Sequence, residues 1–173
     1  MKNDDQLIHE FQNGHRQAFD ELVRRYLDSV YAFFFRLTSD EMESEDLAQD
    51  VFLQLYKYLP KFRFESSFTT YLYRINTNVA ITAFRKKHWR KLLHLDQAPE
   101  PAVQPEESGF QQTELWSAIR QLPKQQQRVV MLRISQQLPY RDIAAILDIS
   151  VNSAKVNFHH GVQKLKSIMQ RSS

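Results

Sequence analysis

The stretch from Lys61 to Lys91 combines the side chains that binding to an unpaired nucleic-acid strand requires. Aromatic rings that could stack on bases occur early in it: Phe62, Phe64, Phe68, Tyr71 and Tyr73. Neutral hydrogen-bonding groups overlap with them and follow them: Thr69, Thr70, Asn76, Thr77 and Asn78. Cations that could contact phosphates come last: Arg85, Lys86, Lys87, Arg90 and Lys91. A groove for single-stranded DNA or RNA holds bases by their faces and the backbone by charge, so this composition is typical of one.

A single long helix is predicted to position these side chains. Residues 67–89 contain no Gly or Pro, and Ser66 or Ser67 can cap the helix. One apolar stripe recurs at helical spacing: Phe68, Leu72, Ile75, Val79 and Ala83. A second face, about 100° round the helix, is aromatic at one end and cationic at the other. It consists of Tyr71, Arg74, Asn78, Thr82 and Arg85. An ordinary amphipathic core helix with a solvated basic end would show the same pattern, so this pattern alone does not distinguish a nucleic-acid-binding helix from a core helix.

Composition narrows the class of protein. The chain has 173 residues and 42% hydrophobic content, and its 3 Gly and 6 Pro favour helices over a many-turned β protein. It contains no Cys, hence neither a disulfide framework nor a thiolate metal site. Because we find neither a signal-peptide pattern nor a membrane-spanning apolar run, we expect a cytoplasmic protein without membrane insertion.

Charge is segregated along the chain. Residues 61–95 carry 8 Lys/Arg against 1 Asp/Glu, and residues 115–173 carry 9 against 2. The preceding segments are acidic, with 6 against 12 in residues 1–60 and 0 against 5 in residues 96–114. Two basic blocks separated by an acidic one predict two nucleic-acid contacts, joined by a segment that avoids DNA.

Three helices are predicted before the first basic block. The first ends near Gly14, the second covers about residues 15–37, and a polar break follows at residues 38–43. Ser44 then opens a third helix that Pro60 stops.

The third helix carries acids beside apolar residues. Asp46 and Asp50 stand one turn apart, but no His or third carboxylate joins them at the spacing that acid–base chemistry or a metal would need. A solvated face is one interpretation of these acids. A protein-docking surface is another, and it explains why Phe52 and Leu53 would lie exposed among them.

The run EDLAQDVFLQLYKYLPKFRFESSFTTYLYRINTNVAITAFRKK (residues 45–87) resembles the second conserved region of extracytoplasmic-function sigma factors of bacterial RNA polymerase. The resemblance rests on an acidic D-L-x-Q-[DE]-x-F-x-x-x-Y helix, a loop ending in S-S-F, and a Y-L-Y-R-I-x-x-N helix with a basic end. It implies that the acidic helix docks on the clamp helices of the polymerase's largest subunit. The residues implied in docking are Asp46, Gln49, Asp50, Phe52, Leu53 and Tyr56.

The same resemblance implies that the loop and the next helix melt the minus-ten promoter element and capture bases of the non-template strand. The residues implied in this step are Arg63, Phe64, Glu65, Ser66, Ser67, Phe68, Tyr71, Arg74, Asn78, Arg85, Lys86 and Lys87. Four residues depart from the family's common choices: Phe64 for Gly, Tyr71 for Trp, Asn76 for Ala and Thr82 for Asp. Tyr71 still offers a stacking face. Phe64 and Thr82, in contrast, do not indicate which promoter bases are preferred.

Residues 94–111 are predicted to form a flexible or extended linker, because they are rich in Pro and acids and lack periodicity. In the family that this chain resembles, the linker threads near the polymerase active site and the RNA exit path. We therefore hypothesise that Glu106 and Glu107 mimic the charge of RNA.

The remainder of the chain is predicted to contain a helix-turn-helix. A short helix at residues 140–148 has small residues, and a tight turn separates it from a final helix capped by Ser150. In the major groove, Asn could pair with adenine, Lys with guanine, and Val156 could touch a thymine methyl. The candidate DNA-contacting residues are Arg141, Asn152, Ser153, Lys155, Val156, Asn157, His159 and His160.

The run LPYRDIAAILDISVNSAKV (residues 138–156) resembles the fourth conserved region of the same family, which reads the minus-thirty-five element. Here Asp148 replaces a common Gly, Ser150 a Pro and Asn152 a Gly. The family's later Arg positions hold other residues, which predicts fewer phosphate contacts. His159 and His160 diverge by about 100° on the helix and lack a further ligand, so no metal site is predicted.

We therefore expect an all-α protein of two small helical domains, residues 1–93 and 112–173, joined by the linker at 94–111. The resemblance implies a non-enzymatic sigma factor without cofactors, which directs core RNA polymerase to promoters and opens the minus-ten DNA. It implies as partners the clamp helices and the flap of the second-largest subunit of core RNA polymerase, promoter DNA, and an anti-sigma factor. The alternatives are a stand-alone helix-turn-helix regulator and a helical adaptor without a nucleic-acid role.

Overall fold

The structure is a computed structural model that describes residues 2–92 and 114–172, and this part of the chain contains helices but no strand. The prediction of an all-helical protein is therefore confirmed. The helices are α1 (Asp4–Gln12), α2 (Arg16–Thr38), α3 (Glu41–Tyr58), α4 (Phe68–Leu92), α6 (Lys124–Ser135), α7 (Tyr140–Leu147) and α8 (Val151–Ser172). A 3-10 turn (Leu59–Lys61) follows α3, and residues 114–119 are also helical. The predicted linker, residues 94–111, lies outside the described residues.

Local sequence determines the first helix. The side chain of Asn3 accepts a hydrogen bond from the backbone N–H of Gln6 at 2.8 Å, and the Gln6 side chain accepts one from the Asn3 N–H at 3.0 Å. This reciprocal capping box satisfies two donors that would otherwise lack partners at a helix start. Leu7, Ile8 and Phe11 are buried, as helical spacing predicts.

Helix α3 begins earlier than the sequence pattern predicted. Asp40, and not Ser44, is its N-cap, because the Asp40 carboxylate accepts a hydrogen bond from the Glu43 N–H at 2.7 Å. Ser44 is completely buried inside the helix, where its hydroxyl bonds to the carbonyl of Asp40. A Ser hydroxyl that bonds one turn back can be buried within a helix, which is why the prediction of a cap at Ser44 was wrong.

Helix α4 buries most of the predicted stripe. Phe68, Leu72, Ile75 and Val79 are buried, but Ala83 is only partly buried and Phe84 packs inside in its place. The prediction that Asn76, Thr77 and Asn78 together offer hydrogen-bonding groups is wrong for the first two, because Asn76 and Thr77 are each 1% exposed. Adjacent helical positions point about 100° apart, so a run of neighbouring polar residues cannot share one face.

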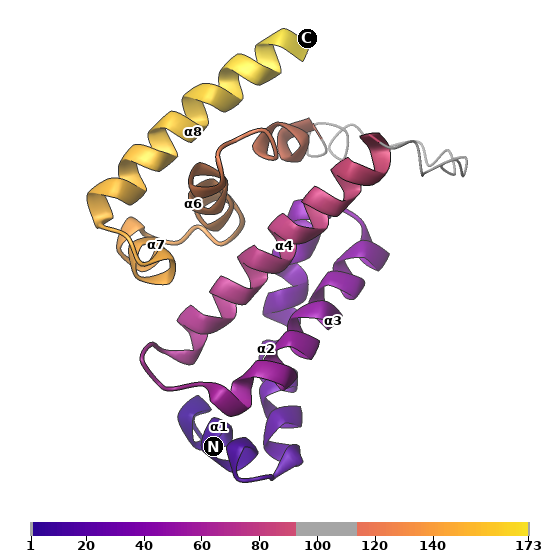
Figure 1. Cartoon of the computed structure of the whole chain (residues 1–173), viewed down its shortest axis with the longest axis vertical. Helices are drawn as coiled ribbons and strands as arrows, with labels where there is room; N and C mark the ends of the chain where they lie inside the picture. Colours follow the sequence, from indigo (N-terminus) through magenta and orange to yellow (C-terminus); the bar gives the residue numbers. More distant parts are fainter. Residues whose placement is uncertain (1, 93–113, 173) are drawn as a thin grey trace.

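The N-terminal and C-terminal helices pack against one another in this conformation. Figure 1 shows α6 and α7 beside α4, with α1, α2 and α3 on the other side of α4. Trp116 donates a hydrogen bond from Nε1 to the carbonyl of Arg36 at 2.9 Å. The guanidinium of Arg120 lies 4.9 Å from the ring centre of Phe84. One buried cluster therefore includes side chains from both ends of the chain, and a smaller one surrounds α7.

Candidate nucleic-acid and polymerase-binding sites

The loop between α3 and α4 carries a chain of aromatic rings. The centroids of Phe62 and Phe64 are 5.0 Å apart, and those of Phe62 and Tyr71 are 4.9 Å apart. Burial raises the pKa of the Tyr71 hydroxyl above its ordinary value, with a smaller contribution from Tyr58. A tyrosine hydroxyl is already protonated at neutral pH at its ordinary pKa, and this shift keeps the Tyr71 ring uncharged to higher pH, which suits stacking on a base.

A hollow of about 350 Å³ opens beside these rings. Its lining consists of Tyr58, Lys61, Phe62, Arg63, Glu65, Ser66, Tyr71 and Arg74. The structure thus brings five of the predicted minus-ten residues (Arg63, Glu65, Ser66, Tyr71 and Arg74) around one space. Aromatic walls beside cations can hold a base by its face and its phosphate by charge.

Phe68 does not belong to this surface. It is 2% exposed and packs edge-on against Tyr26, with 5.2 Å between ring centroids. The prediction that Phe68 contacts DNA is wrong in this conformation, because its position at the start of the buried stripe of α4 removes it from solvent. Ser67 instead caps this helix, since its hydroxyl accepts a hydrogen bond from the Thr70 N–H at 3.2 Å.

Two further predicted strand-facing residues contact the C-terminal half of the chain. Arg74 donates from Nη2 to the carbonyl of Ala145 at 3.0 Å and from Nε to the carbonyl of Ile146. Arg128 of α6 donates to Oδ1 of Asn78 at 2.8 Å. Helices α6 and α7 therefore engage this face of α4. Arg85 is exposed, whereas the side chains of Lys86 and Lys87 lie outside the described residues.

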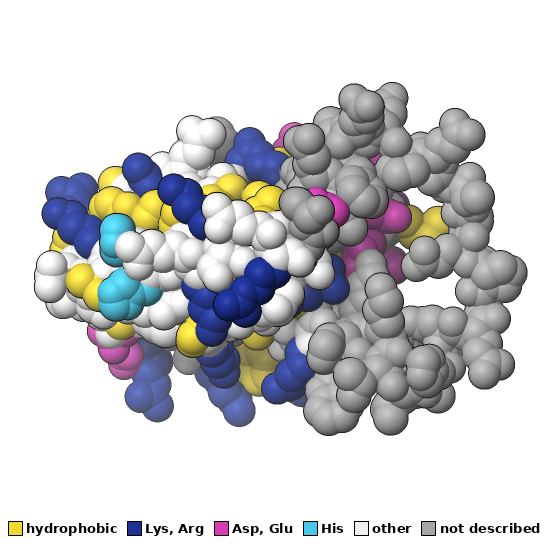
Figure 2. Space-filling view, turned by 90° about the horizontal axis from the view of Figure 1, so that it is seen from above, with side chains coloured by type: hydrophobic (Ala, Val, Ile, Leu, Met, Phe, Trp, Pro, Cys, Tyr) yellow, Lys and Arg dark blue, Asp and Glu magenta, His cyan; other side chains and the backbone are white. Residues whose placement is uncertain are grey.

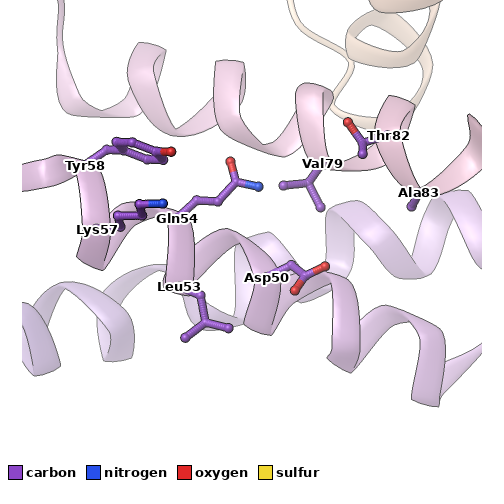
Figure 3. Close-up of a pocket in the computed structure, with 8 residues that line it drawn as sticks. All are labelled: Asp50, Leu53, Gln54, Lys57, Tyr58, Val79, Thr82 and Ala83. Atoms are coloured by element: carbon purple, nitrogen blue, oxygen red, sulfur yellow. The ribbon is translucent and has the colours of Figure 1, made fainter. Parts of the chain in front are cut away.

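The acidic face of α3 is accessible. Asp46, Gln49, Asp50, Leu53 and Tyr56 are exposed, with Leu53 at 62%. Phe52 is only partly exposed and packs against the core, so the prediction of an exposed Phe52 was wrong. A second hollow, of about 510 Å³, lies between α3 and α4, and Figure 3 shows Gln54 of α3 and Val79 of α4 among its lining residues.

The predicted helix-turn-helix is present as α7, a turn and α8. Asp148 ends α7 in the left-handed conformation, with φ of 55°. Ser150 caps α8 by accepting a hydrogen bond from the Ser153 N–H at 3.0 Å. Figure 2 shows His side chains among Lys and Arg on the C-terminal surface of the molecule.

Most candidate DNA-contacting residues of this motif are exposed: Arg141, Asn152, Lys155, Val156, His159 and His160. Asn157 and Ser153 are partly buried and bond to one another, since Asn157 Nδ2 donates to the Ser153 carbonyl at 2.8 Å and to its Oγ at 3.2 Å. The amide nitrogen of Asn157 and the hydroxyl of Ser153 are therefore already hydrogen-bonded to each other, which leaves fewer groups for DNA than the sequence suggested.

Sequence reasoning missed two residues of α1 that contact the loop. Gln12 donates to two loop carbonyls, and the ring of His9 stacks on Phe64. Their separation from the loop by about fifty residues leaves no local sequence signal for these contacts. Within the described residues there is neither a cluster of residues that could hold a metal ion nor a helix long and apolar enough to span a membrane.

These features define the protein as an all-helical one that combines a hollow lined by aromatic rings and cations, an acidic exposed helix and a helix-turn-helix. The family model of sigma-70 region 2 matches residues 22–90, and that of sigma-70 region 4 matches residues 112–165. The chain is 30% identical over 174 residues to the ECF RNA polymerase sigma factor SigW of Bacillus subtilis (strain 168), with 92% of each chain covered. The chain belongs to the extracytoplasmic-function group of the sigma-70 family.

Solved structures have the same fold. The chain matches CnrH, in a structure with the cytosolic domain of CnrY, at a TM-score of 0.65 and 19% identity, covering 98% of this chain and 99% of that one. It matches the sigma factor RpoE of Bartonella quintana, in complex with the anti-sigma factor NepR, at a TM-score of 0.54 and 20% identity. That match covers 88% of this chain and 96% of the other.

Proposed function

We propose that this sigma factor directs core RNA polymerase to its promoters and opens the minus-ten DNA through the hollow beside Phe62 and Tyr71. The observation that carries the proposal is the lining of this hollow, in which three aromatic rings (Tyr58, Phe62 and Tyr71) adjoin three cations (Lys61, Arg63 and Arg74). A flipped base would stack on the rings while the cations hold its backbone. The chain acts as a non-enzymatic factor, in the cytoplasm where promoter DNA is located.

The exposed acidic face of α3 supports docking on the polymerase. Leu53 lies exposed between Asp46 and Asp50 on one side and Tyr56 on the other. A large apolar side chain amid acids fits a protein interface, where the apolar group anchors and the charges guide association. We assign the clamp helices of the largest subunit to this face, and the minus-thirty-five element and the flap to the C-terminal helices.

The contacts between α4 and α7 require a rearrangement before DNA binding. Arg74 cannot donate to the carbonyls of Ala145 and Ile146 and flank a melted strand at the same time. We propose that polymerase binding separates the two halves and that an anti-sigma factor opposes this step. The complex of the structurally similar RpoE with NepR supports such a partner.

Promoter opening by Tyr71 variants tests the proposal. With reconstituted holoenzyme, Tyr71→Ala should reduce permanganate reactivity in the minus-ten region by about tenfold, since one base–aromatic stack contributes roughly 1–3 kcal/mol. Tyr71→Phe keeps the ring and should open the promoter nearly as well as the wild type. Normal opening by the Phe62→Ala/Tyr71→Ala double variant would contradict the proposal.

The acidic face distinguishes this function from that of a stand-alone regulator. Leu53→Ala should weaken co-elution with core polymerase, whereas Leu27→Ala, the same truncation at an exposed position of α2, should leave it unchanged. A stand-alone regulator would bind duplex promoter DNA without polymerase, and neither variant would change co-elution, because none would occur.

A further inference from the structure

Helix α1 holds the loop that carries the hollow. The side-chain amide of Gln12 donates to the carbonyl of Leu59 at 3.1 Å and to that of Phe62 at 2.9 Å. These carbonyls flank Pro60 and Lys61, where the chain leaves α3 and enters the loop. One side chain from a distant helix thus fixes both ends of this turn.

His9, also on α1, supports the loop a few residues further on. Its ring stacks on Phe64 with centroids 4.2 Å apart and an angle of 22° between the planes. Phe64 has a φ of 57°, a left-handed conformation that bulky residues adopt only when neighbouring groups hold them there. Because Phe64 contacts Phe62, and Phe62 contacts Tyr71, the rings form a continuous path from α1 to the hollow.

We propose that Gln12 and His9 are positioning residues for base capture, which set the aromatic wall of the hollow before DNA arrives. This inference rests on the proposed function of the hollow. A wall that is already ordered does not lose conformational freedom when the base binds, so preorganisation strengthens capture without a new contact to DNA. Neither residue lines the hollow, so both act through Phe62 and Phe64.

The contacts of these residues can be separated from the stability of α1. The helix is anchored by the buried Leu7, Ile8 and Phe11 and by the capping box of Asn3 and Gln6. Gln12 is partly buried and His9 is exposed. Gln6→Ala is therefore a matched control, because it removes half of the capping box on the same helix without changing a contact to the loop.

The experiment measures binding of holoenzyme to forked promoter duplexes with an unpaired minus-ten non-template strand. The promoter is one mapped by run-off transcription with the same holoenzyme. Each fork is made with all bases present and with single abasic sites in turn, and the site that most weakens wild-type binding identifies the captured base. The proteins are the wild type, Gln12→Ala, His9→Ala, His9→Phe and Gln6→Ala.

We expect Gln12→Ala to weaken binding of the intact fork roughly tenfold, since it removes two hydrogen bonds that hold the wall. On the abasic fork, the same variant should bind as well as the wild type within about twofold, because no base remains for the wall to hold. His9→Ala should behave in the same way with a smaller loss, and His9→Phe should restore binding because it keeps the stack. Gln6→Ala should leave the ratio between intact and abasic forks unchanged.

Equal losses on intact and abasic forks would overturn the inference and assign Gln12 and His9 a purely structural role. A wild-type holoenzyme that is insensitive to every abasic site would instead refute the proposed function of the hollow. Limited trypsin digestion of the full chain provides a readout without DNA. Cleavage after Lys61 and Arg63 should accelerate in Gln12→Ala but not in Gln6→Ala, and equal rates in the two variants would count against the inference.

Discussion

At the scale of single residues, Asn76 is a polar side chain that is buried without a hydrogen-bond partner for its amide oxygen within the described part of the chain. It is 1% exposed within α4, and its Oδ1 has no hydrogen-bond partner among the described residues. A buried carbonyl oxygen without a partner loses its hydration without compensation. Thr77, the next residue, avoids this cost because its hydroxyl donates to the carbonyl of Tyr73 at 2.8 Å.

Asn76→Ala should therefore increase the free energy of unfolding by about 1 kcal/mol, because it removes the unsatisfied oxygen and improves helix propensity at the cost of some packing. Urea denaturation monitored by circular dichroism would measure the change. Thr77→Val, which removes a hydroxyl that is already satisfied, serves as the control and should not stabilise the protein. A loss of stability in Asn76→Ala would mean that packing around the amide outweighs its desolvation.

At the scale of elements, the packing of α8 on α6 depends on a close contact between Gly161 and Val130. A Cβ placed on Gly161 of α8 would lie 2.8 Å from Cγ2 of Val130 in α6, which is closer than real Cβ atoms come to nonbonded neighbours. Val130 is completely buried and its β-branched side chain is stiff, so it cannot move aside at little cost. Gly161 therefore allows α8, the helix that carries the proposed DNA-contacting side chains, to lie directly on α6.

Gly161→Ala should destabilise the protein by about 1 kcal/mol, since overpacking of roughly 1–3 kcal/mol exceeds a helix-propensity gain of about 1 kcal/mol. Thermal unfolding of the full chain would measure this loss. In a double-mutant cycle, Val130→Ala should cost less in the Gly161→Ala background than in the wild type, because the added methyl fills the space. Gln163→Ala, at an exposed position of α8, should change stability by less than about 0.5 kcal/mol. Additive effects of Gly161→Ala and Val130→Ala would exclude the contact as the cause.

At the scale of the whole molecule, helices α6 and α7 cover a face of α4 that we propose contacts the promoter strand. Helix α7, the first helix of the helix-turn-helix, accepts hydrogen bonds from Arg74, and α6 contacts Asn78 through Arg128. These residues of α4 are among those assigned to the melted strand. The conformation described here is therefore one in which α4 and a promoter strand cannot meet along this face.

A cross-link across this face should block promoter opening. The chain has no Cys, so Asn78→Cys and Arg128→Cys would provide a unique pair of thiols for a short bis-maleimide. The linked double variant should lose permanganate reactivity at the minus-ten element because α6 and α7 stay against α4. Each single-Cys variant treated with the same reagent controls for the modification itself. Normal opening by the linked protein would show that the two halves need not separate.

Much of the secondary structure could be predicted because local signals determine it. The helix-turn-helix is an example, since Ser150 caps α8 through its own third neighbour and Asp148 provides the left-handed residue between the helices. Local signals failed where a competing contact outweighed them, within α3 for Ser44 and between distant helices for Phe68. Ser44 is of a residue type that often caps helices, but it is buried within α3. Phe68 has an aromatic ring that could stack on a base, but this ring packs on Tyr26.

The sequence by itself determined the family, the helical class, the aromatic and basic composition of α4 and the acidic character of α3, because these are properties of residue type and spacing. Only the tertiary structure decided that Gln12 and His9 support the loop and that Arg74 and Asn78 contact α6 and α7. The physical reason is that these contacts join residues far apart in the chain. Their energies depend on how whole helices pack, and no local pattern encodes that arrangement.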